Sequence, residues 1–440
     1  MVNDGAVTED AWVSVTDGVI TAIGTGNDWP TDAATIIDAS GKLLLPGAID
    51  THVHFRDPGL TQKGDFATES LAAAAGGVTS VIDMPNTVPQ TTTLEAWADK
   101  MQHQGAEKSA VNYAFFIGAT NDNLDTLLQA DYTRVPGIKL FLGSSTGNML
   151  VDREEMLNKL FANAPALIAV HAESEALVRK GIEDARTRFA GREVPIDYHP
   201  VIRSRQACYE ASHLAVEMAR RHGARLHLLH LSTADELALL GELPNVTAET
   251  SPNYLWFDSA DYATLGSRVK CNPAIKDAAD RQALVKAVAD GRINTIATDH
   301  APHLPSDKEG DALHAASGMP GIETSLRVML ELADRGLVPV TRVVDAMSHE
   351  PARIFGIEGR GYLRPGYAAD LVLAERTDSP APLTDADVHS RCGWTPYAGT
   401  RFHWRVAMTM VNGATVYDGT DAHRIPGAAA PLRFNSKQSE

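Results

Sequence analysis

Short apolar runs alternate with alanine-rich amphipathic segments between Gly47 and about residue 300. This alternation constrains the fold most, because it is typical of repeated βα units around a parallel sheet. Eight strands are expected, at residues 49–55, 79–84, 111–117, 138–142, 167–170, 225–230, 246–250 and 293–298. Helices are expected between them, at stretches such as 66–75, 152–161, 206–221 and 281–290.

Eight such units favour an α/β fold of the (β/α)₈ type, a TIM-like barrel with its active site at the C-terminal ends of the strands. A doubly wound open sheet is the alternative. No GxGxxG run follows a strand to favour a dinucleotide site in such a sheet. The barrel is therefore the leading prediction.

The two ends of the chain have a different pattern. Turn signals such as Asp17-Gly18 and Asn412-Gly413 separate short valine and isoleucine runs, as in β-hairpins. A chain of 440 residues also exceeds the size of one ordinary core. We expect a barrel at residues 47–359 and a small β-sandwich built from residues 1–46 and 360–440.

Composition excludes several classes of protein. The net charge of −17 disfavours nucleic acid as a binding partner, because its phosphates attract basic surfaces. No apolar run has the length of a transmembrane helix, and the N-terminus has no signal core, so a cytoplasmic protein is expected. Cys208, Cys271 and Cys392 are scattered and odd in number, as is typical of reduced thiols. The expected partners are a small-molecule substrate and a second copy in a homodimer, with neither nucleic acid nor a membrane.

His52 and His54 are the strongest chemical signal. Residues i and i+2 of a strand point to the same side, so the two imidazoles converge at the end of the first expected strand. With Asp50 close by, the pair suits a divalent ion of the zinc type. Two hydrogen-bonded strand histidines are the alternative.

Four further candidates lie in or at the ends of other strands: Lys139, His171, His230 and Asp299. A single polar residue at a strand end can be satisfied by backbone groups. Several strands that supply such residues to one rim favour a shared site. His227 lies an odd number of residues from His230 and is expected in the core or behind the ligands.

Lys139 cannot bind a metal ion as an ammonium group, because this group has no lone pair to donate to a cation. Addition of carbon dioxide would convert its amine to a carbamate with two oxygen ligands. A buried lysine paired with a carboxylate is the alternative.

This pattern resembles the amidohydrolase superfamily. Within it, the runs at residues 54–59, 83–87, 143–148, 271–276, 298–303 and 366–372 are similar to dihydroorotases. The resemblance implies two divalent metal ions, zinc being the expected metal. It places His52, His54 and Asp299 at one ion, His171 and His230 at the other, and a carboxylated Lys139 across both. It also implies that Asp299 is the catalytic acid and base.

The implied reaction is the reversible hydrolysis of the cyclic amide of dihydroorotate to N-carbamoyl-aspartate, in pyrimidine synthesis. Arg56, two residues beyond His54, can bind the substrate carboxylate through two hydrogen bonds. Asn86, Asn272 and His303 resemble the family's other substrate contacts. The alternative for Arg56 is a surface arginine paired with Asp57.

Two alternative functions stay open. An allantoinase or hydantoinase shares the fold and metals, and Arg56 is the feature against it. An inactive relative serving as a structural partner of another pyrimidine enzyme is the second, and the complete ligand set weighs against it.

Overall fold

The computed structural model describes residues 1–143 and 149–435. Its centre is a parallel barrel, and β8 and β9 are two parts of one strand interrupted at Phe116. The strands, each parallel to the next, are β6 (Ala48–Val53), β7 (Val78–Asp83), β8 (Asn112–Phe115), β9 (Ile117–Gly118), β10 (Ile138–Phe141), β11 (Ile168–His171), β12 (Leu226–Leu228), β13 (Val246–Thr250) and β14 (Thr295–Ile296). The ring closes where the His54 amide donates to the His300 carbonyl at 2.8 Å. The predicted barrel is confirmed.

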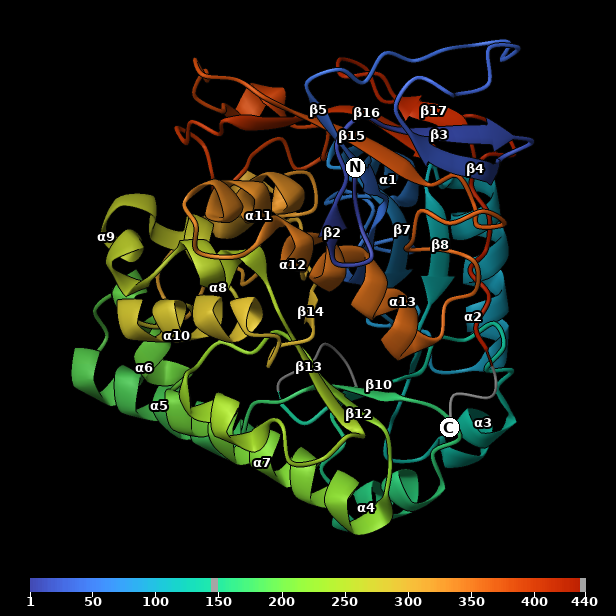
Figure 1. Cartoon of the computed structure of the whole chain (residues 1–440). Helices are drawn as coiled ribbons and strands as arrows, with labels where there is room; N and C mark the ends of the chain where they lie inside the picture. The colour runs from blue at the N-terminus through green and yellow to red at the C-terminus, as the bar shows by residue number, and fades with distance from the viewer. Residues whose placement is uncertain (144–148, 436–440) are drawn as a thin grey trace.

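Helices surround this barrel (Figure 1). The longer ones are α1 (Phe66–Ala75), α4 (Glu154–Asn163), α5 (Glu175–Phe189), α7 (Arg205–His222), α10 (Ala278–Ala289) and α11 (Ser325–Asp334). Short helices are α2 (Leu94–Asp99), α3 (Leu124–Gln129), α6 (His199–Ile202), α8 (Pro252–Trp256), α9 (Tyr262–Leu265), α12 (Val340–Val344) and α13 (Glu350–Phe355). In the part of the chain that the structure describes, none of the helices combines the length and the apolarity needed to cross a membrane.

Local sequence sets the helix ends. The Asp65 carboxylate accepts from the Thr68 amide at 2.8 Å and begins α1. The long helix α7 begins after Ser204, whose hydroxyl accepts from the Ala207 amide, and ends at Gly223 with φ of 70°. This left-handed conformation favours glycine, so the sequence stops the helix there.

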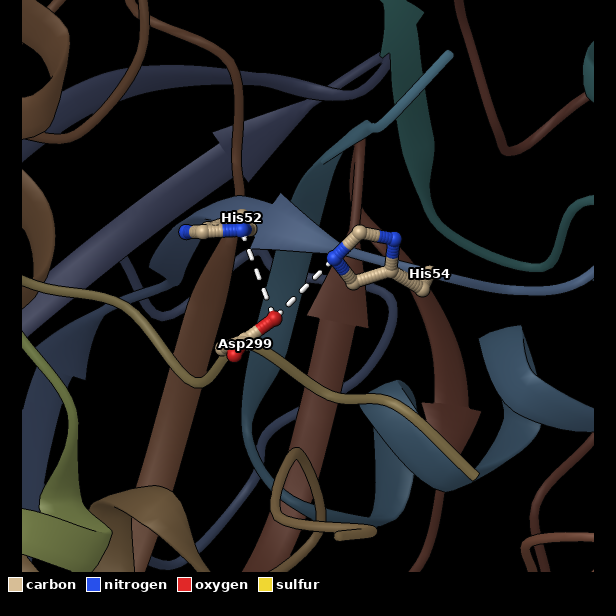
Figure 2. A group of neighbouring side chains, drawn as sticks. All are labelled: His52, His54 and Asp299. Atoms are coloured by element: carbon tan, nitrogen blue, oxygen red, sulfur yellow. Dashed lines mark ion pairs between the residues drawn. The ribbon is translucent and has the colours of Figure 1, made fainter. Parts of the chain in front are cut away.

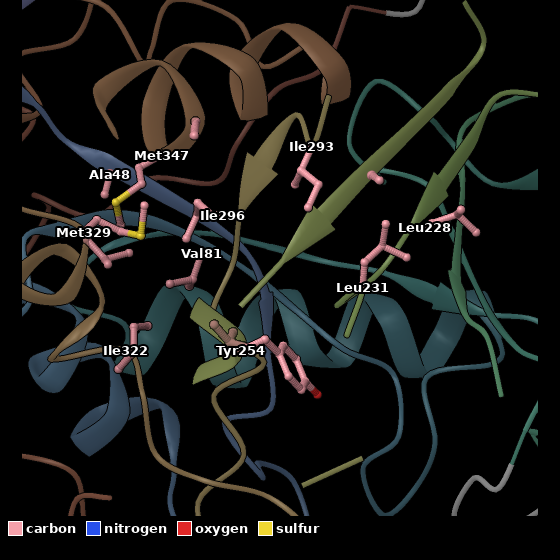
Figure 3. Packing of buried hydrophobic residues seen from close by; sticks show 14 of the residues in the cluster. Ala48, Val81, Leu228, Leu231, Tyr254, Ile293, Ile296, Ile322, Met329 and Met347 are labelled. Atoms are coloured by element: carbon pink, nitrogen blue, oxygen red, sulfur yellow. The ribbon is translucent and has the colours of Figure 1, made fainter. Parts of the chain in front are cut away.

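The core lies between the strands and the surrounding helices. Figure 3 shows Leu228 and Leu231 on one side, Met329 and Met347 on the other, and the strand residues Val81 and Ile296 between them. The side chains of this cluster are almost fully buried. The strands are therefore held from outside by apolar contacts, which leaves their C-terminal ends free to carry polar groups.

Both ends of the chain contribute to antiparallel sheets beside the barrel (Figure 1). One sheet has the order β17-β16-β15-β5, with β5 at Lys42–Pro46, β15 at Leu371–Arg376, β16 at Trp404–Val411 and β17 at Ala414–Tyr417. The hairpin of β3 (Ala11–Thr16) and β4 (Val19–Thr25) packs on it through a small apolar cluster, and β1 (Val2–Asn3) pairs with β2 (Ala6–Val7). This confirms the predicted flanking sheets from both ends, while the boundaries at residues 46 and 360 stay predictions.

The segment before the C-terminus returns to the barrel. The Tyr113 amide donates to the Ala430 carbonyl at 3.2 Å, and the Leu432 amide donates to the Tyr113 carbonyl at 2.9 Å. Leu432 and Phe434 are buried with Phe116 at the N-terminal side of the barrel. This segment therefore packs at the end of the barrel opposite the strand ends that bear the candidate ligands.

Candidate metal centre and active site

His52 lies on β6 and His54 directly follows this strand, and both point toward Asp299, which follows β14 (Figure 2). The nitrogen Nε2 of His52 is 3.3 Å from Asp299 Oδ1, and Nε2 of His54 is 3.0 Å from the same oxygen. The three ligand atoms lie within 4.8 Å of one another. Two imidazole nitrogens and one carboxylate oxygen are a donor set that suits zinc.

The opposite nitrogen of each ring is held by a second residue. His52 Nδ1 is 2.6 Å from the Glu249 carboxylate on β13, and His54 Nδ1 is 2.8 Å from Asn86 Oδ1. Both oxygens accept hydrogen bonds, so each Nδ1 carries the proton and each Nε2 keeps its lone pair. The two lone pairs therefore face the Asp299 carboxylate, as metal ligation requires.

His171 and His230 form a second pair beside the first. His171 Nδ1 lies 2.8 Å from His230 Nε2, and the ring centroids of His52 and His230 are 5.3 Å apart. His171 Nε2 is 3.1 Å from the Glu173 carboxylate, which leaves His171 Nδ1 to face His230. The two facing nitrogens are close enough to share one ion.

Lys139 lies on β10 and is fully buried. Its Nζ has no hydrogen-bond partner among the described residues and sits 4.6 Å from the centroid of the Phe141 ring. Burial lowers the pKa of Lys139 to about 7, although Asp299 and Glu249 favour its charge. The described residues thus do not offer the carboxylate partner of the alternative interpretation, and a neutral amine is the form that adds carbon dioxide.

Three residues of this site have strained backbone conformations. Arg56, His230 and Asp299 have φ values of 66°, 40° and 50°, in the left-handed region that side chains disfavour. Such strain is typical of functional sites, where the surrounding fold holds a residue in place. Each of the three residues lies shortly after the end of a barrel strand. Arg56 follows β6, His230 follows β12 and Asp299 follows β14.

The protonation states suit cation binding. Burial lowers the pKa of His54 to about 4, so its imidazole is neutral near pH 7. Burial alone would raise the pKa of Asp299, but His52, His54 and His230 together lower it below the usual range. A neutral imidazole and an ionised carboxylate are the forms that bind a metal.

Arg56 and His303 lie next to each other at the mouth of the barrel. Arg56 Nε donates to the Pro302 carbonyl at 3.1 Å, and Arg56 Nη2 is 3.1 Å from His303 Nε2. Asp57 instead contacts Lys108 at 2.7 Å. Arg56 is therefore a fixed, half-buried cation close to His54, and Asp57, its predicted alternative partner, is engaged elsewhere.

The remaining predicted residues divide into two groups. Asn86 contacts His54, as described, and Asn272 Oδ1 is buried without a hydrogen-bond partner in the described ranges, so it can accept from a ligand. Asp50 does not join the ligand group, because its carboxylate accepts from the Thr298 amide and hydroxyl at 3.1 and 2.5 Å. Its role is to tie β6 to the segment after β14. Of the run at 143–148, all but Gly143 lies outside the described residues.

Sequence reasoning missed three charged residues around the site: Glu249, Glu173 and Lys63. Glu249 stands one residue before the end of a buried strand, the same kind of position as the histidines, and this signal could have found it. His227 lies behind it, with Nε2 3.5 Å from the Glu249 carboxylate, in agreement with its expected place behind the ligands. Glu173 and Lys63 lie on loops and carry no such signal.

Comparison with known proteins agrees with this geometry. A dihydroorotase of Methanosarcina mazei is 33% identical over 98% of this chain and 96% of its own length. An allantoinase of Bacillus velezensis is 32% identical over 93% of this chain and 91% of its own length. The solved L-hydantoinase (dihydropyrimidinase) from Arthrobacter aurescens matches with a TM-score of 0.92 and 28% identity, over 98% of this chain and 97% of that one. The model of the amidohydrolase family matches residues 43–416, and the chain belongs to this family.

Proposed function

We propose that the chain is a dihydroorotase, which hydrolyses the ring amide of dihydroorotate to N-carbamoyl-aspartate and catalyses the reverse closure. The observation that carries this proposal is Arg56, a fixed guanidinium two residues beyond His54, after the strand that carries His52. Dihydroorotate has an exocyclic carboxylate, whereas allantoin and hydantoin have none. A guanidinium held at the site distinguishes these substrates by charge.

The candidate ligands fit two divalent ions. His52, His54 and Asp299 would hold one, and His171 and His230 the other, with a carboxylated Lys139 between them. When bound, such ions lower the pKa of water toward neutrality and polarise an amide carbonyl. The Nζ of Lys139, which has no hydrogen-bond partner among the described residues, and the converging imidazole lone pairs support this arrangement.

The chain's own groups then move the proton and hold the ring. The ionised Asp299 carboxylate accepts a proton from the attacking water and returns it to the leaving ring nitrogen. Arg56 and His303 bind the substrate carboxylate, and Asn272 Oδ1, which has no partner in the described ranges, accepts from a ring N–H. Asn86 keeps its Nδ2 donor for the substrate while its oxygen orients His54.

A second candidate function is hydrolysis of an uncharged cyclic ureide. The likeness to an allantoinase and to an L-hydantoinase favours it, because these proteins share most of the chain length and the fold. In that case Arg56 would have no anionic group to bind.

The test is a comparison of substrates on the purified, zinc-loaded protein. Hydrolysis of dihydroorotate, allantoin and hydantoin is measured by kcat/KM, and ring closure of N-carbamoyl-aspartate is measured separately. We expect dihydroorotate to be preferred by at least about tenfold, the scale of one hydrogen bond to a charged group. A preference for allantoin or hydantoin would refute the proposal, and no turnover of any ring would favour the structural-partner alternative.

A further inference from the structure

We propose that Lys63 is a positioning residue that decides which ring nitrogen of His303 carries the proton. In this role Lys63 makes His303 a hydrogen-bond donor toward the substrate carboxylate, next to Arg56. The inference deepens the proposed function and rests on it for the identity of the anion. Lys63 lies in the loop before α1, nine residues after His54 in the printed sequence.

Each ring nitrogen of His303 lies beside a cationic hydrogen-bond donor, although a neutral imidazole can accept only one hydrogen bond. Its Nδ1 is 3.1 Å from Lys63 Nζ, and its Nε2 is 3.1 Å from Arg56 Nη2. Ammonium and guanidinium groups donate hydrogen bonds and accept none. A neutral imidazole has one lone pair, so it can accept from only one of these two cations.

The imidazole is neutral in this setting. Burial and the nearby charges of Arg56, Lys63 and Lys308 lower the pKa of His303 to about 2, against a backbone hydrogen bond to Ser317 that favours the charged ring. Two protonated nitrogens facing two cations would add repulsion on both sides. His303 therefore carries a single N–H, on either Nδ1 or Nε2.

Lys63 donates to the ring nitrogen of His303 that carries the lone pair. Its Nζ is 3.3 Å from Asp307 Oδ2, an ion pair that holds the ammonium beside Nδ1. Asp307 Oδ2 lies farther from His303 Nδ1, at 3.6 Å, which exceeds hydrogen-bond distance. An N–H on Nδ1 would thus point at an ammonium and, among the described residues, reach no side-chain acceptor within hydrogen-bond distance. The lone pair belongs on Nδ1, and the proton on Nε2.

The consequence lies on the other side of the ring. The Nε2–H of His303 then faces the Arg56 guanidinium, donor against donor, at 3.1 Å. A carboxylate oxygen placed between them accepts from both, which removes the conflict and adds two charge-assisted hydrogen bonds. An uncharged ring provides no such anionic oxygen. Lys63 therefore favours substrates with a carboxylate without touching that carboxylate.

The first test reads the tautomer directly. Histidine-selective ¹⁵N NMR on the zinc-loaded protein without substrate distinguishes a protonated ring nitrogen from one with a lone pair, and His303→Gln identifies the His303 signals. We expect the proton on Nε2 in the wild type and in Lys63→Arg, which keeps a cationic donor. In Lys63→Met the proton should move to Nδ1 or distribute over both nitrogens. A wild-type proton on Nδ1, or an unchanged tautomer in Lys63→Met, would overturn the proposal.

The second test is kinetic. Lys63→Met should raise KM for dihydroorotate roughly tenfold or more and change kcat by less than about twofold, because the lost interaction binds the substrate. KM for hydantoin should stay unchanged, and Lys63→Arg should restore most of the affinity. Lys159→Met, which removes an exposed helix lysine paired with Glu155, is the matched control and should have no effect.

The outcomes separate the two proposals. An equal rise of KM on both substrates in Lys63→Met would show a structural role for Lys63 and overturn its role in specificity. If the wild type does not act on dihydroorotate, the proposed function fails. The tautomer measurement, which uses no substrate, then decides alone whether Lys63 sets the state of His303.

Discussion

Glu249 should control how tightly the protein holds a metal ion, although its carboxylate is expected to stay out of the ligand set. Its carboxylate is fully buried and lies 2.6 Å from His52 Nδ1. Glu249→Gln keeps the shape and an acceptor oxygen but removes the charge. A hydrogen bond to a charged group contributes about 1.5–3 kcal/mol and one between neutral groups about 0.5–1.5 kcal/mol. The difference of about 1–1.5 kcal/mol corresponds to roughly a tenfold loss of zinc affinity.

Glu249→Ala should lose more. It leaves His52 Nδ1 without its acceptor and removes the Glu249 contacts with His227 and Thr51, which are both 3.5 Å long. We expect a loss toward hundredfold, the upper end for residues that orient a metal ligand. Affinity is measured on the metal-free protein by competition with a zinc chelator of known affinity.

The matched control for this series is Glu331→Gln on α11. Glu331 is another buried carboxylate that holds a histidine, with Oε1 3.1 Å from His403 Nδ1, but it lies outside the candidate metal centre. Its substitution should leave zinc affinity unchanged. Wild-type affinity in both folded Glu249 variants would refute the orienting role, and an equal loss in Glu331→Gln would show a general effect of destabilisation.

Four further changes test other parts of the site and fold. Arg56→Met should lower kcat/KM for dihydroorotate by about 10- to 150-fold and leave any hydantoin activity nearly unchanged, in paired steady-state assays; equal losses would assign Arg56 a structural role. Lys139→Ala should abolish activity and remove a ¹³C NMR carbamate signal formed from labelled bicarbonate, and absence of that signal in the active wild type would contradict carboxylation. Asp299→Asn should lower kcat by roughly 10²-fold or more with the fold intact by circular dichroism, and near wild-type turnover would require another base. Phe434→Ala should destabilise the protein by about 3–5 kcal/mol in urea titrations, because this buried ring packs beneath the barrel, and an unchanged midpoint would show that the C-terminal segment is dispensable.

The barrel could be predicted because strand and helix periodicity are local properties of the sequence. The errors are at strand ends. The last barrel strand was expected at 293–298, but β14 covers only Thr295–Ile296, because the Thr298 amide donates to the Asp50 side chain instead of a neighbouring strand. The strand expected at 225–230 ends at Leu228, and His230 beyond it adopts a φ of 40°. Both departures occur where the chain turns to present a candidate ligand.

The candidate ligands could be predicted for a related reason, since polar residues stand out at the ends of apolar strands. The residues that contact these ligands and the substrate-binding side chains could not be predicted. Whether Lys63 reaches His303, or a tail residue such as Phe434 reaches the barrel, depends on how segments distant in the sequence meet. The tail pairs mainly through backbone groups, which leave no periodic pattern to recognise.

The partners also decide between the two interpretations of the strand histidines. In two structural histidines, the ring nitrogens would form hydrogen bonds to each other or to the backbone. Here Glu249 and Asn86 hold the outer nitrogens of His52 and His54, so both inner lone pairs face inward. The nearby buried amine of Lys139 has no partner in the described part of the chain. Inward lone pairs and an ionised carboxylate attract a cation, whereas the same histidines with apolar residues at positions 86 and 249 would be free to rotate. The metal centre is thus inferred from the residues behind the histidines as much as from the histidines themselves.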